Sequence, residues 1–507
     1  MDLEKMALKS LSAESPTPPK MSVCAMLTFL LITISAAAVL EFCYTNHSFN
    51  LEVNTERPVT NNSETSIKFS MYPPVKAGEN HLQHVVRLLE VLGYTQTSIN
   101  ELDWNLLWAH EYPFQNISEM MRHLLPHQTV NHIPGIGFLT SKVDLSTASL
   151  PFMPKAFRLP QEKEEFLKYT SINPDTLFVE KHNKHRYIKI CSSNSINLSS
   201  SETFLQEFIE NPFLVDGHKF DIGVYAVITS VDPLLSYIYT GDVLFRYCSE
   251  KYFPFDSKNV KKYVVGNDYV PTWEVPSLIK YFEIFGGGMR ASFDAYVRDQ
   301  SMEPSVIWTQ VENIVRETIL AKKNNIVLAM RPYKTGNFFE LLRFDLIVDD
   351  ELKVHLMEIN MSPNLSSAHF KQNALLYEQV LYSVFNLVGV GSPLRAKQSR
   401  LDDEIITSDK NIAVNLSDCA KYSCHKSCYK SECKMCLPCL KGSEIQILRK
   451  AHFEHLHKVD MKRIYPKAVV YPENFNIEAE VKNQFTKDAW LTRWFYGKCK
   501  DERSWCQ

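Results

Sequence analysis

Apolar positions follow a helical period in some parts of the chain and run continuously in others. Leu82, Val85, Val86 and Leu89 recur at i, i+3, i+4 and i+7, which predicts an amphipathic helix. Helical periods return over 305–320 and 374–388, and continuous apolar runs predict strands at 177–180, 187–190, 222–231, 234–239, 243–247 and 326–330. Strands and helices are mixed without regular alternation, so the pattern predicts an α+β or layered α/β fold.

Changes in composition divide the 507 residues into five predicted segments. We expect an N-terminal tail over 1–21, an uncharged membrane-spanning anchor over 22–40, and a stalk rich in Asn, Thr, Ser and Pro over 41–80. A folded enzyme body follows over 81–400, and a cysteine-rich region ends the chain over 415–507.

The uncharged segment suggests a location. Lys5, Lys9 and Lys20 precede it, whereas residues 41–60 carry only Arg57, so the positive-inside bias predicts a single-pass type II membrane protein with most of the chain in the secretory lumen. A cleaved signal peptide and a cytosolic-facing body are the alternatives. Sites of the form N-x-[ST] are compatible with a lumenal glycoprotein; they begin at Asn46, Asn61, Asn116, Asn197, Asn360, Asn364 and Asn415.

The overall composition is that of a folded globular chain, with 45% apolar and 22% charged residues. The net charge is −3, whereas a general nucleic-acid binder carries a strong basic excess. We therefore expect no nucleic acid among the partners.

Cysteines crowd into the C-terminal region. Six lie between Cys419 and Cys439, and Cys499 and Cys506 follow. An even number of thiols predicts disulfides if this region is lumenal, whereas Cys433-x2-Cys436-x2-Cys439 predicts zinc if it is cytosolic.

The segment 338–364 contains the most informative polar residues. Two apolar strands flank the polar turn at 348–351, which predicts a β-hairpin with a two-residue loop, Asp349-Asp350 or Asp350-Glu351. Side chains alternate along a strand, so Glu358 and Asn360 share a face and an even-length loop puts Asp345 on it too. Two carboxylates and an amide oxygen are hard ligands that suit Mg²⁺, although a solvated polar face is the simpler interpretation of the hairpin alone.

Several further motifs accompany this hairpin in a fixed order: Trp104-Asn105-Leu106-Leu107-Trp108, Pro134-Gly135, QEFIENP at 206–212, Lys219-Phe220-Asp221, Phe245-Arg246-Tyr247 and MEINMSPN at 357–364. Together they resemble the tubulin–tyrosine ligase-like family over residues 82–390. The resemblance implies a two-lobed ATP-grasp fold. It also implies an ATP- and Mg²⁺-dependent ligase that adds an amino acid, glutamate first among the candidates, to a carboxylate of tubulin or another acidic-tailed protein.

The resemblance also implies roles for individual residues. Asp345, Glu358 and Asn360 correspond to Mg²⁺ ligands, and Lys181 to a lysine on the ATP phosphates. Gln206, Glu207 and Ile209 correspond to the stretch against the adenine, and Asn267 to a later ATP-site asparagine. Lys219 and Asp221 correspond to a pair on nucleotide and substrate, and Arg246 to an arginine facing substrate or phosphate.

Two positions differ from the family pattern. The stretch 181–188 lacks the glycine-bearing loop that closes over phosphates, and Gly223 stands where the pattern Lys-Phe-Asp-Leu-Arg has its arginine. A positioned donor of this kind contributes roughly 10²–10³ in rate. A catalytically degenerate, membrane-anchored binding protein on the same scaffold is therefore the alternative function.

Overall fold

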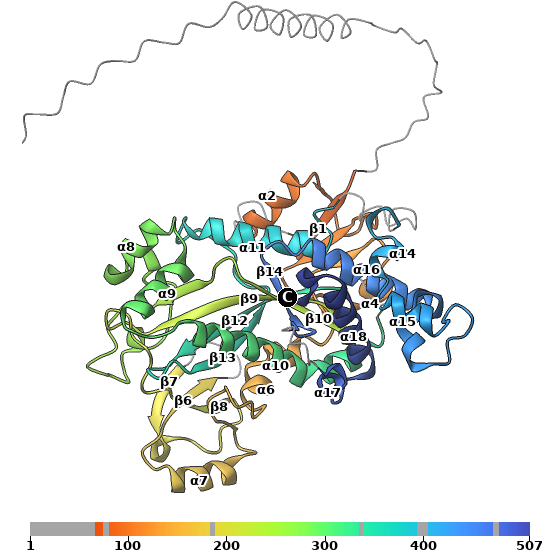
Figure 1. Cartoon of the computed structure of the whole chain (residues 1–507). Helices are drawn as coiled ribbons and strands as arrows, with labels where there is room; N and C mark the ends of the chain where they lie inside the picture. Colours follow the sequence, from red (N-terminus) through yellow and green to blue (C-terminus); the bar gives the residue numbers. More distant parts are fainter. Residues whose placement is uncertain (1–65, 75–80, 183–187, 334–337, 393–403, 470–475) are drawn as a thin grey trace, which may run out of the picture. The chain divides into compact units, whose positions relative to one another are not determined.

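The computed structural model of the chain describes residues 66–74, 81–182, 188–333, 338–392, 404–469 and 476–507. They belong to one compact unit, Ser66–Gln507 (Figure 1). It includes strand β1 (Lys68–Tyr72), which lies within the predicted stalk and buries Phe69 and Met71, so folded structure begins before His81. The predicted segments 1–21 and 22–40 lie outside the described residues.

A six-stranded sheet forms the centre of this unit. Its order is β13-β12-β9-β10-β14, with β11 also paired to β9, and all pairs are antiparallel. The strands are β9 (Phe220–Val231), β10 (Leu234–Tyr239), β11 (Leu244–Tyr247), β12 (Glu340–Val348), β13 (Val354–Met361) and β14 (Met461–Tyr465). Strand β12 is buried along its whole length, so this sheet lies inside the core.

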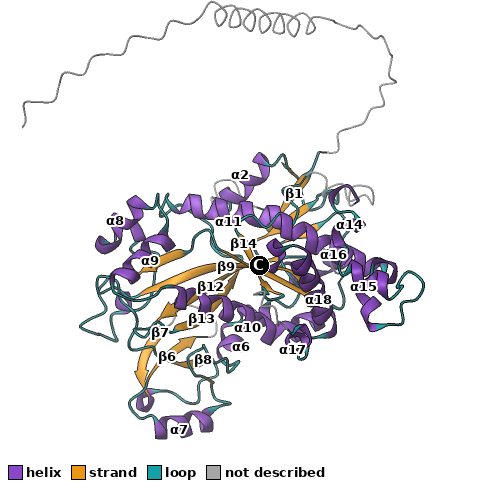
Figure 2. Cartoon of the chain, in the orientation of Figure 1, coloured by secondary structure: helices purple, strands orange, loops and turns teal. Residues whose placement is uncertain are grey.

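Two four-stranded sheets contain the other named strands of the described residues. One has the order β5-β8-β6-β7 and consists of β5 (Ala156–Arg158), β6 (Leu177–His182), β7 (Ile188–Ser192) and β8 (Thr203–Glu207). The other has the order β2-β1-β3-β4 and adds β2 (Thr95–Gln96), β3 (Leu106–Ala109) and β4 (Thr129–Val130). The mixture of sheets and helices confirms the predicted α+β, ATP-grasp-like fold (Figure 2).

Helices contribute the remaining regular structure. In the first half they are α2 (Gln83–Val91), α3 (Pro113–Asn116), α4 (Ser118–Arg122), α5 (Gly137–Thr140), α6 (Lys142–Ser146) and α7 (Lys163–Ile172). Further along are α8 (Pro276–Ile284), α9 (Met289–Asp299), α10 (Ser305–Met330), α11 (Asn373–Leu387), α14 (Asp409–Ile412), α15 (Leu416–Lys421), α16 (Gly442–Leu456), α17 (Ile477–Val481) and α18 (Thr486–Asp501). Both α10 and α11 contact the central sheet.

The predicted secondary structure is correct at most of these places. Helices α2, α10 and α11 and strands β6, β7, β9, β10 and β11 match the predicted segments. The strand predicted at 326–330 is wrong, because these residues form the last turns of α10. Buried positions Ile319, Lys323 and Ile326 continue the helical spacing, and neither Gly nor Pro interrupts it.

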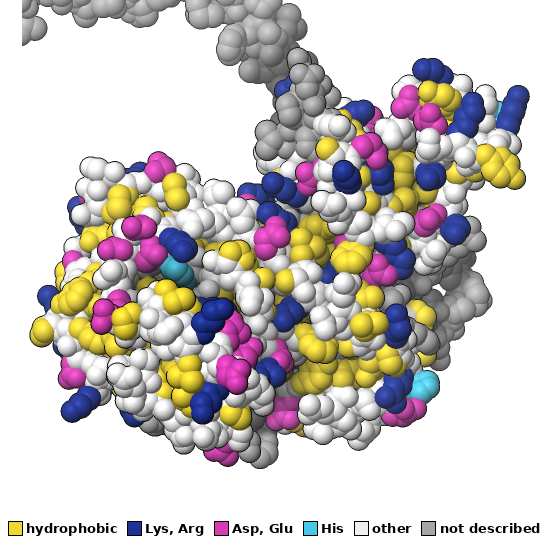
Figure 3. All heavy atoms as spheres, turned by 90° about the horizontal axis from the view of Figure 1, so that it is seen from below, with side chains coloured by type: hydrophobic (Ala, Val, Ile, Leu, Met, Phe, Trp, Pro, Cys, Tyr) yellow, Lys and Arg dark blue, Asp and Glu magenta, His cyan; other side chains and the backbone are white. Residues whose placement is uncertain are grey.

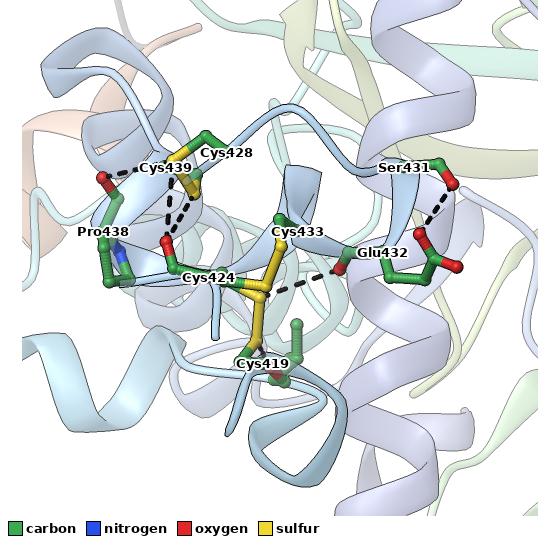
Figure 4. Close-up of a disulfide and its surroundings, with 10 residues drawn as sticks. Cys419, Cys424, Cys428, Ser431, Glu432, Cys433, Pro438 and Cys439 are labelled. Carbon is green, nitrogen blue, oxygen red and sulfur yellow. Dashed lines mark hydrogen bonds between the residues drawn. A yellow bond between two sulfur atoms is a disulfide. The ribbon is translucent and has the colours of Figure 1, made fainter. Parts of the chain in front are cut away.

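The cysteine-rich region is closed by disulfides, as the first of the two alternatives predicted. The pairs are Cys419–Cys436, Cys424–Cys433, Cys428–Cys439 and Cys499–Cys506. Figure 4 shows the first three grouped within one short segment. The disulfides take up every cysteine of the predicted zinc motif. Strand β14 of the same region pairs with β10 and so becomes part of the central sheet.

The membrane prediction needs correction. Within the described ranges, no helix combines the length and the apolar character needed to cross a bilayer, and residues 22–40 lie outside those ranges. The type II topology, the signal-anchor, the membrane partner and the lumenal glycoprotein are therefore withdrawn.

The near-neutral net charge is visible on the surface. Figure 3 shows one face on which Lys and Arg side chains (dark blue) are interspersed with Asp and Glu side chains (magenta). Mixed charge of this kind produces no extended field of a single sign on that face.

Candidate functional site

A cavity of about 630 Å³ is lined by residues of both the central sheet and the small sheet β5-β8-β6-β7. The small sheet contributes Lys181 from β6 and Glu207 from β8. The central sheet contributes carboxylates and a guanidinium, and the segment 260–267 lines a further part. Ligand pockets commonly combine apolar walls with a few convergent polar groups.

Strands β12 and β13 bring two of the carboxylates together. Asp345 and Glu358 are directly opposite each other in the register of this antiparallel pair. The predicted two-residue loop is wrong, because five residues, 349–353, separate the strands. An odd-length loop would put Asp345 and Glu358 on opposite faces, but the register shifts beside Asp345 and restores the shared face.

Asn360 completes the predicted set of three. Its Nδ2 donates to Asp345 Oδ2 at 3.1 Å and to Glu358 Oε1 at 3.3 Å. Two carboxylates and an amide oxygen suit a hard divalent cation such as Mg²⁺, and the Asn360 amide would have to turn its Oδ1, in place of Nδ2, toward that cation. In the part of the chain that the structure describes, no group of three or more His, Cys, Asp or Glu side chains forms a metal cluster, so a cation here would depend on the Asn360 amide.

The guanidinium groups of Arg246 and Arg343 bind the buried carboxylates of Asp221 and Asp345. Arg246 binds Asp221 through Nε and Nη2, both at 2.8 Å, and its Nη2 also lies 3.0 Å from Asp345 Oδ2. Arg343 binds Asp345 through Nε at 2.6 Å and through Nη2 at 2.9 Å. Paired hydrogen bonds between an arginine and a carboxylate fix the orientation of both groups.

These contacts move the pKa values of the two aspartates in opposite directions. Burial raises the pKa of Asp221 to about 6, although Arg246 opposes the shift. Burial also acts to raise the pKa of Asp345, but Arg343 and Arg246 outweigh it and the net shift is downward. Asp345 therefore remains ionised at neutral pH.

Two lysines face the same cavity. Burial lowers the pKa of Lys181 to about 8, and its Nζ donates to Gln206 Oε1 at 2.6 Å. Burial likewise lowers the pKa of Lys219 to about 8, and its Nζ lies 4.9 Å from the centre of the Phe208 ring. A buried ammonium without a strong anionic partner favours the arrival of an anion.

The sequence-predicted residues converge at this cavity. Those that line it are Lys181, Glu207, Ile209, Lys219, Asp221, Arg246, Asn267, Asp345 and Glu358. Gln206 and Asn360 are not part of the lining, but each bonds a residue that is.

Two cationic residues near the site were missed by sequence reasoning. Lys142 Nζ, at the start of α6, lies 3.0 Å from Glu358 Oε2. No local pattern connects residues so far apart in sequence. Arg343 precedes Asp345 by two positions in a strand, so the alternation of side chains could have placed it on the same face.

Comparison with known proteins supports the family resemblance of the sequence. The family model described as the tubulin-tyrosine ligase family matches residues 118–398. The chain belongs to the tubulin-tyrosine ligase family. The matched range contains every residue of the predicted site.

Named relatives of this family are similar over different shares of their length. A Caenorhabditis elegans protein named "Probable tubulin polyglutamylase ttll-15" is 42% identical over 446 residues, 85% of each chain. The human protein named "Tubulin polyglutamylase TTLL7" is 26% identical over 75% of this chain and 46% of its own length. The mouse protein named "Tubulin polyglutamylase TTLL5" is 28% identical over 55% of this chain and 22% of its own length. The chain thus spans most of the worm relative but less than half of the other two.

Proposed function

We propose that this protein is an ATP- and Mg²⁺-dependent ligase that joins glutamate to a side-chain carboxylate of an acidic protein segment, with tubulin as the first candidate acceptor. The main support is the convergence of residues from both sheets on one cavity of about 630 Å³. Membership of the tubulin-tyrosine ligase family and the names of the relatives favour this reaction class.

The residues divide the work by charge. In this proposal Asp345, Glu358 and Asn360 hold Mg²⁺, and Lys181 and Lys219 direct their ammonium groups at phosphate oxygens. Gln206 keeps Lys181 in place through its hydrogen bond. Bound Mg·ATP would supply the phosphoryl group that makes a carboxylate reactive toward an amine.

The remaining polar groups orient the reacting partners. Hydrogen bonds to Asp221 and Asp345 hold the Arg246 guanidinium in one orientation. It is therefore already oriented when a carboxylate or phosphate of the substrate binds. Preorganised cationic groups of this kind stabilise developing negative charge. Lys142 forms an ion pair with Glu358, and both side chains are partly exposed, so an arriving cation can displace the Lys142 ammonium.

The test uses the full chain with purified tubulin, Mg·ATP and radiolabelled glutamate. We expect label to enter tubulin with the unaltered protein and not with Glu358→Gln. Parallel reactions with labelled glycine identify the amino acid transferred. Absence of both incorporation and Mg·ATP-dependent thermal stabilisation would overturn the proposal, whereas stabilisation without incorporation would favour a non-catalytic nucleotide-binding protein.

A further inference from the structure

Gly223 and Arg343 lie next to each other on the face of the central sheet that carries the site. Gly223 is opposite Asp345 in the pairing of β9 with β12, and Tyr225 is opposite Arg343. Since side chains alternate, Asp221 and position 223 share the face that Arg343 and Asp345 occupy.

The Arg343 side chain fills the space that a side chain at 223 would need. A Cβ atom at Gly223 would lie 3.0 Å from Arg343 Cδ and 3.4 Å from Arg343 Nε. The backbone gives no other reason for glycine here, because Gly223 lies in a regular strand and does not have a positive φ. An arginine at 223 would therefore crowd the observed Arg343 side chain, which would have to move to accommodate it.

The guanidinium of Arg343 extends along the strand to the site. It passes over Gly223, is almost completely buried, with 7% exposure, and makes a paired contact with Asp345. Arg246 approaches the same carboxylate from β11. Asp345 thus receives two guanidinium groups even though position 223 supplies none.

We propose that Arg343 is a positioning residue that supplies, from strand β12, the guanidinium that the family pattern carries on strand β9 at the position of Gly223. It acts through Asp345, whose carboxylate it orients toward the cation and phosphates. The inference rests on the proposed function, since it assigns a role at the same site.

Steric fit favours an exchange over a simple loss. If the arginine at 223 had only been lost, its volume would be open to solvent or filled by an apolar side chain. Instead the Arg343 side chain occupies the space beside Gly223, and its guanidinium donates to the Asp345 carboxylate. The charge is retained while its strand of origin has changed.

A reciprocal exchange tests this directly in the full chain. The variants are Arg343→Gly, Gly223→Arg, the double variant Gly223→Arg with Arg343→Gly, and a matched control, Gly223→Met with Arg343→Gly, which restores volume without charge. Calorimetry measures affinity for Mg²⁺ with a non-hydrolysable ATP analogue, and thermal melting measures stability.

We expect Arg343→Gly to lower the affinity for the Mg²⁺–analogue complex by about 10- to 100-fold, as for other residues that orient a metal ligand. Gly223→Arg alone should lower Tm, because two side chains then compete for one space. The double variant Gly223→Arg with Arg343→Gly should recover the Tm lost in Gly223→Arg and the affinity lost in Arg343→Gly. The Met control should have a similar Tm but should not recover the affinity. Recovery of affinity by Met, or no loss in Arg343→Gly, would overturn the inference.

The stability arm keeps this result separate from the proposed function. If the unaltered protein does not bind the Mg²⁺–analogue complex, the proposed function fails. The exchange is then judged by Tm alone. An unchanged Tm in Gly223→Arg alone would reject the exchange. So would a Tm that stays low when Gly223→Arg is combined with Arg343→Gly.

Discussion

Two groups of buried, oppositely charged side chains have different surroundings. The site cluster consists of Asp221, Arg246, Arg343 and Asp345. Asp221, Arg246 and Asp345 line the cavity of about 630 Å³, and Arg343 is bound to Asp345. The core pair, Lys323 of α10 and Asp488 of α18, is enclosed by protein, with exposures of 2% and 0%. Asp488 also accepts from the backbone N–H of Leu234 at 2.8 Å and from Tyr465 Oη at 3.3 Å.

The comparison separates two uses of buried charge. In the core pair, Lys323 donates to Asp488, and Asp488 also accepts from Leu234 of β10 and Tyr465 of β14. The two charges compensate each other within the protein, and no ligand is required to balance them. The site cluster has several cations and anions within reach of one another beside open space. Its contacts can be exchanged for a cation or a phosphate without exposing an uncompensated charge.

Breaking the core pair should produce the largest change in stability. Lys323→Met leaves the Asp488 carboxylate buried without its cation, so we expect the free energy of unfolding to fall by about 3–5 kcal/mol. Chemical denaturation measures the loss. Affinity of the remaining folded protein for the Mg²⁺–analogue complex should be unchanged, and a selective loss of affinity would contradict the division between the two groups.

Changing the site should have the reverse signature. Glu358→Gln removes a charge from a partly exposed side chain, so we expect little change in Tm but a loss of ligase activity of roughly 10²–10³. Glu351→Gln, on the exposed turn of the same hairpin, is the matched control. Equal activity in the two variants would remove Glu358 from the site.

The lysines of the cavity predict a pH dependence of binding. Lys181 and Lys219 each have a pKa of about 8, so both are charged below that pH and neutral above it. Affinity for the Mg²⁺–analogue complex should therefore fall above pH 8, by up to about tenfold per lysine and pH unit. The variant with Lys181→Arg and Lys219→Arg stays charged and should flatten the profile. A profile that is equally steep in this variant would assign the titration to other groups.

The smallest effect should come from removing both charges of the core pair together. Lys323→Met combined with Asp488→Asn keeps an acceptor for the Leu234 N–H and leaves no unpaired charge. We expect the double variant to lose about 1 kcal/mol or less of unfolding free energy, because the desolvation of two ions is removed along with their attraction. A loss as large as that of Lys323→Met alone would show that packing, and not charge, maintains this contact.

Sequence periodicity is sufficient to predict a helix or strand where the spacing of apolar residues within that element is unambiguous. The spacing of Leu82, Val85 and Leu89 predicted α2, and the apolar run at 222–231 predicted β9. The run at 326–330 was misassigned because a short apolar stretch is compatible with both helix and strand. These residues are helical because they continue α10 without a break.

The chemistry of the site was also readable in part. The types and order of the motif residues, above all Asp345, Glu358 and Asn360, predict which side chains belong together. In the structure Asp345 and Glu358 line one cavity, and Asn360 donates hydrogen bonds to both. The length of the hairpin loop was not readable. The register shift that brings Asp345 opposite Glu358 depends on pairing between strands, which local sequence does not specify.

The sequence by itself determined the family, the α+β class and the identity of the charged groups, because these depend on residue types and on short-range periodicity. Only the tertiary structure decided that Lys142 contacts Glu358 and that Arg343 lies over Gly223. Both contacts depend on the positions of separate elements around the central sheet. The balance of charge at the site is a property of that packing, since a buried charge is stabilised by its neighbours in space.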